Sequence, residues 1–357
     1  RANPKYVTIV APLTTWSFSF VAGTGHIVYP LLPVIYETAH QNGIRPERPM
    51  AIATIASQQA ITASPVAAAT AAMIGLFAEK GMSQWGLPQI LMICVPATLT
   101  GVVAAAIVSM FVGKDLRDDA AYQERLRSGQ IPAPQSAGER PPLKPAAQLS
   151  AFLFLAGVAL VVLFGFFPEL RRLPGAKSPL GMPIVIEIVM MAVAAIMLML
   201  TRVNVDEVPK TATLRAGVVA VIGIFGLAWL GDSFIAAHKD VIVPAIGHWA
   251  EAAPWTFAFG LFFASVLLYS QAATTRALMP LGIALGIPPQ FLIAMFPSVN
   301  GYFFIPTYGS LIAAINFDLS GTTKIGKYVL NHSFMIPGLV ATSVAVTSGL
   351  LLARLMF

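Results

Sequence analysis

The stretch Gly86–Gly113, which reads GLPQILMICVPATLTGVVAAAIVSMFVG, contains no charged side chain. A run of about 20 apolar residues is long enough for an α-helix to cross the hydrocarbon core of a bilayer. A second uncharged run of this kind occupies Ser333–Leu352. Both runs are too apolar for the surface of a water-soluble domain, so we expect them to be transmembrane helices.

The composition of the whole chain agrees with this interpretation. Of the 357 residues, 57% are hydrophobic and 11% are charged, whereas soluble domains carry about 25% charged residues. The net charge is +6, and the basic residues lie in short loops between apolar runs, as the positive-inside rule expects. We therefore expect no nucleic-acid partner. The alternating strands of a membrane β-barrel are absent, so the sequence predicts an all-α polytopic membrane protein surrounded by lipid.

One polar segment divides the apolar runs into two groups. The stretch Lys114–Lys144 carries six Lys/Arg and five Asp/Glu residues. We expect residues 114–146 to be a solvated cytoplasmic linker between a first repeat, residues 1–113, and a second repeat, residues 147–357. The chain begins with RANPK directly before an apolar run, which is typical of an internal loop. We therefore expect the first repeat to lack its N-terminal helices.

The two halves share an order of features, which is why we interpret them as repeats. In each half an apolar run leads into a small polar cluster, Gly23-Thr24-Gly25-His26 in the first and Ser270–Thr275 in the second. A Gly-Ile-x-Pro turn follows, and then a span broken by small polar residues. From Ser57 to Pro65 is eight positions, as it is from Ser298 to Pro306. Paired broken segments are the best sequence indication of a transporter binding site.

Interrupted helices suit an anionic ligand for a physical reason. Unwound backbone within a membrane is tolerated only where it lines a cavity or meets a ligand. Helix N-termini present partial positive charge to anions, and neutral Ser, Thr, Gln and Asn add hydrogen bonds without burying a charge. Small residues also serve close helix packing, but four clusters at matched spacing favour a site. The candidate substrate-binding residues are Gly23, Thr24, Gly25, His26, Ser57, Gln58, Gln59, Thr62, Ser64, Ser270, Gln271, Thr274, Thr275, Arg276, Ser298, Asn300, Gly301 and Thr307.

Two charged residues among the apolar runs are candidates for function. Arg276 follows Thr275 at the second cluster, and its planar guanidinium suits a carboxylate; it could instead pair with Asp232 or reach an interface. Asp232 is a candidate site for a coupling ion or proton, or a partner at a helix end. We find no phosphate-binding loop and no catalytic or metal-binding constellation. We therefore expect no enzyme activity and no cofactor, while coupling to H⁺ or Na⁺ stays open.

Several stretches resemble one known family closely. The sequences AGTGHIVYPLLPVI from Ala22, YSQAATTRALMPL from Tyr269 and PTYGSLIAAINFDLSG from Pro306 are similar to the Dcu family of anaerobic C4-dicarboxylate transporters. The resemblance implies an inner-membrane carrier that takes up or exchanges fumarate, succinate, malate and aspartate. The family is similar to a wider ion-transporter superfamily with inverted repeats, two re-entrant helical hairpins and two broken transmembrane helices, which moves its substrate by an elevator motion.

The resemblance assigns places to the polar clusters. Gly23–Gly25 and Ser270–Thr275 would be the hairpin tips, and Ser57–Pro65 and Ser298–Thr307 would be the broken-helix loops. His26 and its neighbours resemble the fumarate–succinate exchanger branch, whereas Ser270–Met279 resembles the aspartate-uptake branch, so the preferred substrate stays open. Two other functions also stay open: a dicarboxylate channel, and a membrane partner of a dicarboxylate-responsive sensor kinase. A homodimer is a further open alternative.

Overall fold

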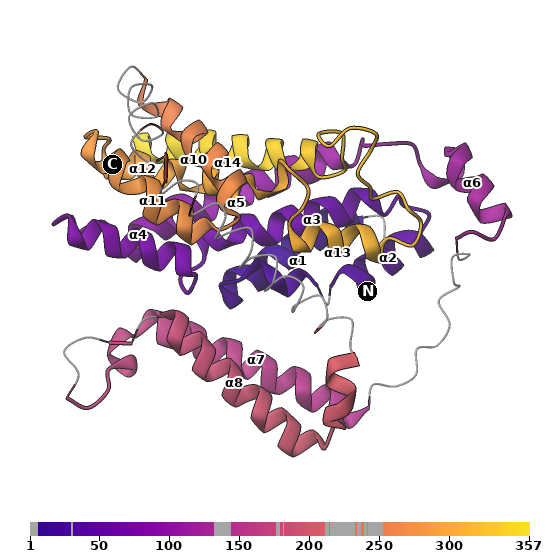
Figure 1. The fold of residues 1–357 in the computed structure, drawn as a ribbon, viewed down its shortest axis with the longest axis horizontal. Helices are drawn as coiled ribbons and strands as arrows, with labels where there is room; N and C mark the ends of the chain where they lie inside the picture. Colours follow the sequence, from indigo (N-terminus) through magenta and orange to yellow (C-terminus); the bar gives the residue numbers. More distant parts are fainter. Residues whose placement is uncertain are drawn as a thin grey trace.

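The architecture of the described chain is entirely helical (Figure 1). The structure is a computed structural model, which describes residues 6–29, 31–131, 144–175, 179–180, 182–210 and 253–357, and single residues at 214, 233, 237, 238 and 241. Within these residues there is no β-strand, only one isolated bridge between Ile325 and His332. The predicted all-α class is therefore confirmed.

Among the residues that the structure describes, three helical segments are long and apolar enough to cross a membrane. They are Glu47–Glu79, which contains a break, α5 (Leu87–Ser109) and α14 (Met335–Met356). Helices α5 and α14 pack against each other along much of their length. Gly101 allows this close approach, because a Cβ at that position would lie 2.3 Å from the carbonyl oxygen of Ala341. These segments are consistent with the predicted polytopic membrane protein.

Before α5, the chain forms two helices joined by a tight turn and then one interrupted helix. The elements are α1 (Val7–Ala22), η2 (Gly25–Val28), α2 (Leu32–Gln41), α3 (Glu47–Gln59), η3 (Ala60–Ala63) and α4 (Ala68–Glu79). The interruption follows η3, where Ser64 has extended backbone angles. It therefore lies within the stretch Ser57–Pro65 that the sequence marks as broken.

After residue 253 the same order of elements recurs. The elements are η7 (Pro254–Thr256), α10 (Phe257–Leu268), α11 (Gln271–Ala284), α12 (Pro289–Met295), η8 (Phe296–Phe303) and α13 (Gly309–Phe317), followed by α14. Within η8, Asn300 leaves helical backbone angles, and Tyr308 is extended at the start of α13. The second interruption thus begins where the sequence predicts it and extends to Tyr308.

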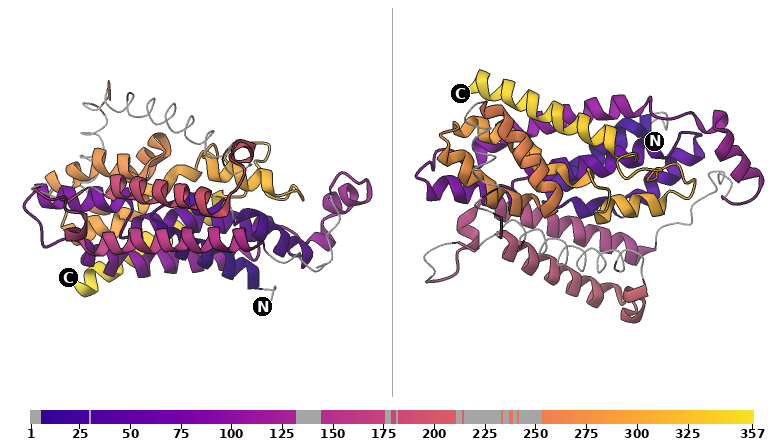
Figure 2. Two further views of the ribbon diagram at one scale, coloured as in Figure 1. Left: turned by 90° about the horizontal axis from the view of Figure 1, so that it is seen from below. Right: turned by 45° about the horizontal axis from the view of Figure 1, so that its top comes forward.

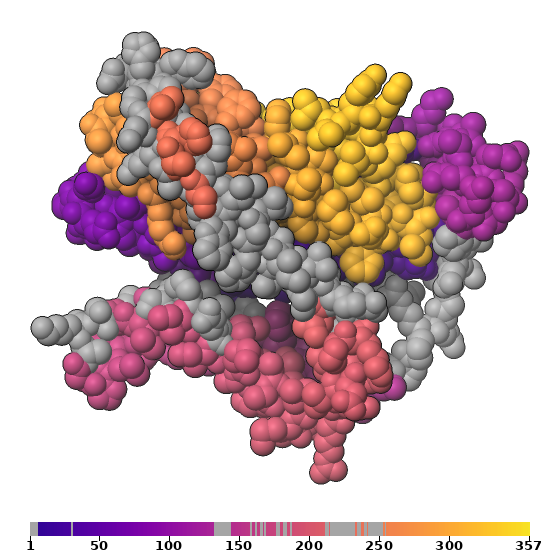
Figure 3. Space-filling model, in the orientation of Figure 1, coloured from indigo at the N-terminus to yellow at the C-terminus, as the bar shows by residue number. Residues whose placement is uncertain are grey.

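Between the two halves, a pair of helices lies along one side of the main helical body (Figures 1 and 2). The elements here are η4 (Leu116–Asp118), α6 (Ala120–Arg127), α7 (Pro145–Phe166), η5 (Pro168–Arg171), α8 (Met182–Thr201) and η6 (Val205–Lys210). The space-filling view shows the atoms of α7 and α8 gathered along one edge (Figure 3). Val185 and Val189 of α8 form an apolar cluster with Val66, which follows the first interruption.

The linker carries a helix that we did not expect from its sequence. Asp119 caps α6 by accepting hydrogen bonds from the backbone N–H groups of Ala121 and Tyr122, each at 3.1 Å. Arg45, in the turn between α2 and α3, donates to Asp119 at 2.6 Å. The first part of the linker is therefore folded onto the helical body instead of being a plain solvated loop.

The apolar core consists of two clusters that meet at the interruptions. Along α3, the residues from Met50 to Ile55 belong to one cluster, while Ala56 and Ala60 belong to the other. The second half repeats the pattern: the buried residues from Leu292 to Val299 belong to one cluster, and those from Tyr302 to Ala314 to the other. The polar residues of both interruptions therefore lie at the junction between two apolar cores.

Candidate functional site

Two tight turns, after α1 and after α10, each start at a residue with left-handed backbone angles. Helix α1 ends at Gly23, whose φ is 69° and whose N–H donates to the carbonyl of Ser19 at 2.8 Å. Helix α10 ends at Tyr269, whose φ is 49° and whose N–H donates to the carbonyl of Ser265 at 3.2 Å. A non-glycine residue in this region is uncommon and costs free energy. The strain at Tyr269 indicates that the neighbouring contacts fix this turn.

The helix that follows each turn starts with a hydroxyl cap. The Thr24 Oγ1 accepts from the N–H of His26 at 3.3 Å, and the Ser270 Oγ accepts from the N–H of Ala273 at 3.2 Å. Such caps satisfy one of the N–H groups that the first turn of a helix leaves unpaired. The matched caps place a helix N-terminus at each turn.

The interruptions and the second turn meet in a group of side-chain amides, which we call the amide cluster: Gln58, Gln59, Gln271 and Asn300. The Gln271 Nε2 donates to the Gln58 Oε1 at 3.1 Å and to the Asn300 Oδ1 at 3.2 Å. The Asn300 Nδ2 in turn donates to the Gln59 Oε1 at 3.3 Å. Gln58 and Asn300 are fully buried. Residues more than 200 positions apart in the sequence thus share one hydrogen-bonded network.

The first turn reaches the same place through Gly25. A Cβ at this position would lie 2.2 Å from the Gln58 Nε2, so only glycine leaves the Gln58 amide where it is. Gly25 and Gln271 therefore both approach Gln58, and Asn300 joins the same network through Gln271 and Gln59, so all four polar segments that the sequence singled out meet around the amide cluster. The Gln58 Nε2 has no hydrogen-bond partner among the residues that the structure describes. A buried amide donor without a partner is unusual in a folded protein, and it is available to a ligand.

One member of the arrangement was missed by the sequence analysis. Thr342, in the middle of α14, accepts a hydrogen bond from the Gln59 Nε2 at 2.8 Å. A single Thr in an apolar helix usually bonds to its own backbone, so its sequence gave no sign of this contact. It joins the amide cluster to the last transmembrane helix.

Several other predicted residues hold the backbone around the cluster. The hydroxyls of Ser57, Thr62, Thr274 and Thr275 are buried and donate to carbonyls three or four residues earlier in the chain. Ser64 donates to the carbonyl of Phe20 at 2.6 Å, and the N–H of Gly301 donates to the Ser265 Oγ at 2.7 Å. These contacts hold the backbone of the turns and the interruptions around the amide cluster.

A few predicted residues lie apart from the amide cluster. The His26 ring stacks on Tyr29, and Thr307 shares a hydrogen bond with the Tyr269 hydroxyl. Arg276 is exposed, and no ion pair joins it to a described residue. Its contact with substrate stays a prediction. Asp232 lies outside the described residues.

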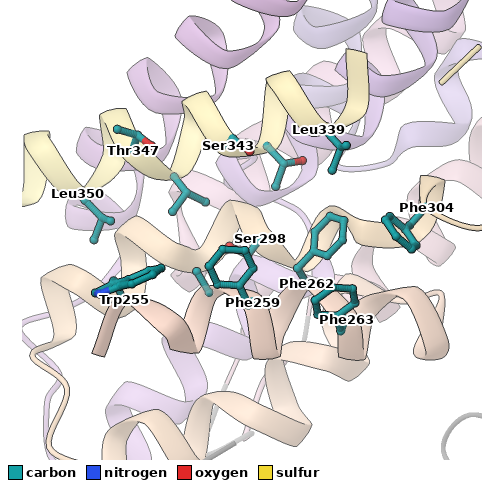
Figure 4. Close-up of a pocket in the computed structure, with 13 residues that line it drawn as sticks. Trp255, Phe259, Phe262, Phe263, Ser298, Phe304, Leu339, Ser343, Thr347 and Leu350 are labelled. Carbon is teal, nitrogen blue, oxygen red and sulfur yellow. The ribbon is translucent and has the colours of Figure 1, made fainter. Parts of the chain in front are cut away.

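Ser298 faces a groove between α10 and α14 instead of the amide cluster (Figure 4). The groove has a volume of about 340 Å³ and is lined mostly by aromatic and aliphatic side chains, among them Trp255, Phe259 and Phe262. Removing a carboxylate from water into such surroundings is costly. The groove is therefore unsuited to a dianion, although Ser298 and Thr342 bring its wall close to the amide cluster.

The electrostatic character of the amide cluster is neutral. Its four side chains carry no charge and offer N–H donors as well as carbonyl acceptors. Among the described residues no group of three or more His, Cys, Asp or Glu could hold a metal ion. The arrangement can bind a polar or anionic group by hydrogen bonds, but it offers no general acid, nucleophile or metal for catalysis.

Comparison with known proteins identifies the relatives of this chain. The family model described as "Anaerobic c4-dicarboxylate membrane transporter" matches residues 1–357. The C4-dicarboxylate transporter DcuA of Escherichia coli strain K12 is 40% identical over 358 residues, which cover 100% of this chain and 81% of the relative. DcuA of Wolinella succinogenes is 39% identical with the same coverage. The anaerobic C4-dicarboxylate transporter DcuB of Shigella flexneri is 37% identical over 361 residues, covering 99% and 81%. No solved structure matches the chain significantly.

Proposed function

The chain belongs to the family of anaerobic C4-dicarboxylate membrane transporters, and we propose that it takes up and exchanges fumarate, succinate, malate and aspartate across a bacterial inner membrane. It is a transporter and not an enzyme.

The observation that carries the proposal is the meeting of four polar segments around the amide cluster. A carrier must bind a doubly charged substrate strongly enough to remove it from water, but weakly enough to release it. Neutral amides fit this demand, because they stabilise a carboxylate by hydrogen bonds without a permanent buried charge. The Gln58 Nε2, which has no partner among the described residues, would give an incoming carboxylate oxygen a hydrogen-bond donor.

We further propose an elevator motion between two bodies. The two halves would be inverted repeats, with α1–α2 and α10–α11 as re-entrant hairpins and α3–α4 and α12–α13 as broken transmembrane helices. The α7–α8 pair would belong to the stationary body. The apolar contact of Val185 and Val189 with Val66 supports this division, because an interface without directional hydrogen bonds permits sliding. Full burial of Gln58 and Asn300 favours alternating access over an open channel.

Counterflow in proteoliposomes tests the proposed substrate class. Vesicles loaded with succinate should accumulate labelled fumarate, and external malate or aspartate should compete with it. Butyrate, which carries one carboxylate, should not compete. The same assay with and without Na⁺, and across a pH gradient, identifies the coupling ion. Saturable counterflow that butyrate inhibits as well as succinate would overturn the two-carboxylate site, and transport without saturation would favour a channel.

A further inference from the structure

Two buried tyrosines lie on the same short elements as residues of the amide site. Tyr29 follows η2 and Tyr302 lies in η8, with 7% and 3% of their surfaces exposed. Neither hydroxyl has a hydrogen-bond partner among the residues that the structure describes. Most buried polar groups in folded proteins are paired. Two unpaired tyrosine hydroxyls in one apolar cluster therefore call for a partner that the described residues do not supply.

A third tyrosine, Tyr308, lies in the same apolar cluster as these two. Its ring lies 4.9 Å from that of Tyr302, measured between centroids. Tyr29, Tyr302 and Tyr308 belong to one buried cluster, and α13, which follows Tyr308, contacts η2, which precedes Tyr29. Ser310, two residues further on in the first turn of α13, is fully buried, and its Oγ also has no partner in the described part of the chain. We call Tyr29, Tyr302 and Ser310 together the hydroxyl cluster.

The hydroxyl cluster and the amide cluster are held by the same two short elements, η2 and η8. Element η2 begins at Gly25, which packs against Gln58, and Tyr29 directly follows its end. Element η8 carries both Asn300 and Tyr302. Each of these short elements therefore contributes one residue to the amide side and one to the hydroxyl side. The two polar groups are neighbours, as the two ends of one small ligand require.

The chemistry of the hydroxyl cluster favours a carboxylate ligand over a cation. None of its members carries a negative charge, and a bound metal cation usually has carboxylate ligands. Hydroxyls that donate to a carboxylate oxygen form short, charge-assisted hydrogen bonds. Free N–H groups at the start of α13 add partial positive charge beside Ser310.

We propose that Tyr29, Tyr302 and Ser310 bind one carboxylate of the substrate while the amide cluster binds the other. The inference rests on the proposed function, since it assumes that a dicarboxylate is carried. It explains why the protein keeps three buried hydroxyls unpaired, and it makes them the residues that distinguish dicarboxylates from monocarboxylates.

The test uses the full chain in proteoliposomes and two probes, succinate and succinamate, in which one carboxylate is replaced by a neutral amide. We expect Tyr302→Phe and Tyr29→Phe each to raise the KM for succinate counterflow about 10- to 100-fold, as the loss of a hydrogen bond to a charged group does. The wild-type preference for succinate over succinamate should shrink in both variants. Tyr328→Phe, which removes an exposed hydroxyl in the loop before α14, is the control and should change neither value.

Thermal unfolding separates binding from folding. Removing an unpaired buried hydroxyl should leave the Tm of the substrate-free protein unchanged or raise it, whereas the increase in Tm on adding succinate should shrink. Ser310→Ala provides the same test at the third residue of the hydroxyl cluster. Wild-type protein without succinate counterflow would refute the proposed function itself. If the wild type is functional and all three variants keep both the KM and the succinate preference, only the assignment of a carboxylate to the hydroxyl cluster is refuted. Variants that alter Na⁺ dependence alone would refute the same assignment.

Discussion

Two buried polar regions of this protein differ in one respect that separates structure from function. Near the linker, Arg45 and Glu47 are buried, and they pair with each other at 2.5 Å. Arg45 also reaches Asp119, and Glu47 accepts a hydrogen bond from Ser333 at 2.6 Å. At the junction of the two cores, the amide cluster carries no charge, yet its Gln58 Nε2 is unpaired.

The buried charges therefore do not lie where we propose that the substrate binds. The charged region is saturated: its donors and acceptors meet one another and tie the loop before α3 to the linker and to the loop before α14. A saturated network resists change, because breaking it leaves a buried charge without a partner. In the amide cluster and the hydroxyl cluster, several buried groups have no partner among the described residues, and we propose that a ligand completes them. We therefore expect substitutions in the first region to change stability and those in the second to change transport.

The largest expected effect is on transport, at Gly25. Gly25→Ala would place a Cβ 2.2 Å from the Gln58 Nε2, and the flexible Gln58 amide would have to leave the cluster. We expect the succinate kcat/KM to fall at least about 100-fold. Gly75→Ala is the matched control, because a Cβ there meets nothing within 4 Å and should leave transport intact. Equal transport in the two variants would show that Gln58 need not hold its position.

The second effect is on stability, at Glu47. Glu47→Gln removes one charge of a buried pair and should lower the free energy of unfolding by about 3 kcal/mol, measured as a fall in Tm. The KM for succinate should stay at the wild-type value in the folded protein. Glu169→Gln breaks an exposed pair with Arg172 and should change the Tm little. A Glu47→Gln protein with normal Tm and impaired succinate binding would reverse our assignment of the two regions.

A smaller effect is expected at Arg276, which tests whether the substrate contacts a charge. The side chain is exposed, so solvent weakens any contact with a carboxylate. We expect Arg276→Gln to raise the KM for succinate by up to about 10-fold, and Arg276→Lys to raise it less, because the charge survives while the planar fork is lost. The Tm should not change in either variant. A KM unaffected by Arg276→Gln would remove this residue from the site.

The smallest effect concerns the docking of α6. Burial by itself would raise the pKa of Asp119, but its hydrogen bond with Arg45 and its cap of α6 lower it below the ordinary value of 3.8. The folded state is therefore stabilised fully above this value, and the contribution is lost as the pH falls through the lower folded-state pKa. At neutral pH, Asp119→Asn should speed tryptic cleavage at Arg125 and Arg127 without changing transport. Cleavage at the wild-type rate would show that the Asp119 charge does not hold α6.

The sequence allowed much of this fold to be predicted, because spans and breaks leave local signals. Runs without charge gave α5 and α14, and matched Gly, Ser and Pro positions gave the two interruptions. The same spacing indicated that Gln58, Gln271 and Asn300 would converge, and their side chains do meet.

What the sequence did not reveal depends on contacts between distant segments. Tyr29 and Tyr302 look like ordinary apolar residues until their hydroxyls are seen to lack partners, and Thr342 looks like a helix residue that bonds to its own backbone. Helix α6 was missed because it is short and follows a polar stretch. Its stability depends on the capping residue Asp119 and on the distant Arg45.

We propose that a carboxylate completes the hydrogen bonding of Gln58. Succinate binding to the purified Gln58→Leu protein tests this proposal most directly. Isothermal titration calorimetry should show a Kd at least about 100-fold weaker than that of the wild type. The Tm without substrate should be unchanged or higher, since an unpaired buried amide is removed. Gln130→Leu, at an exposed position in the linker, should bind succinate normally. A Gln58→Leu protein that binds succinate with wild-type affinity would contradict the account.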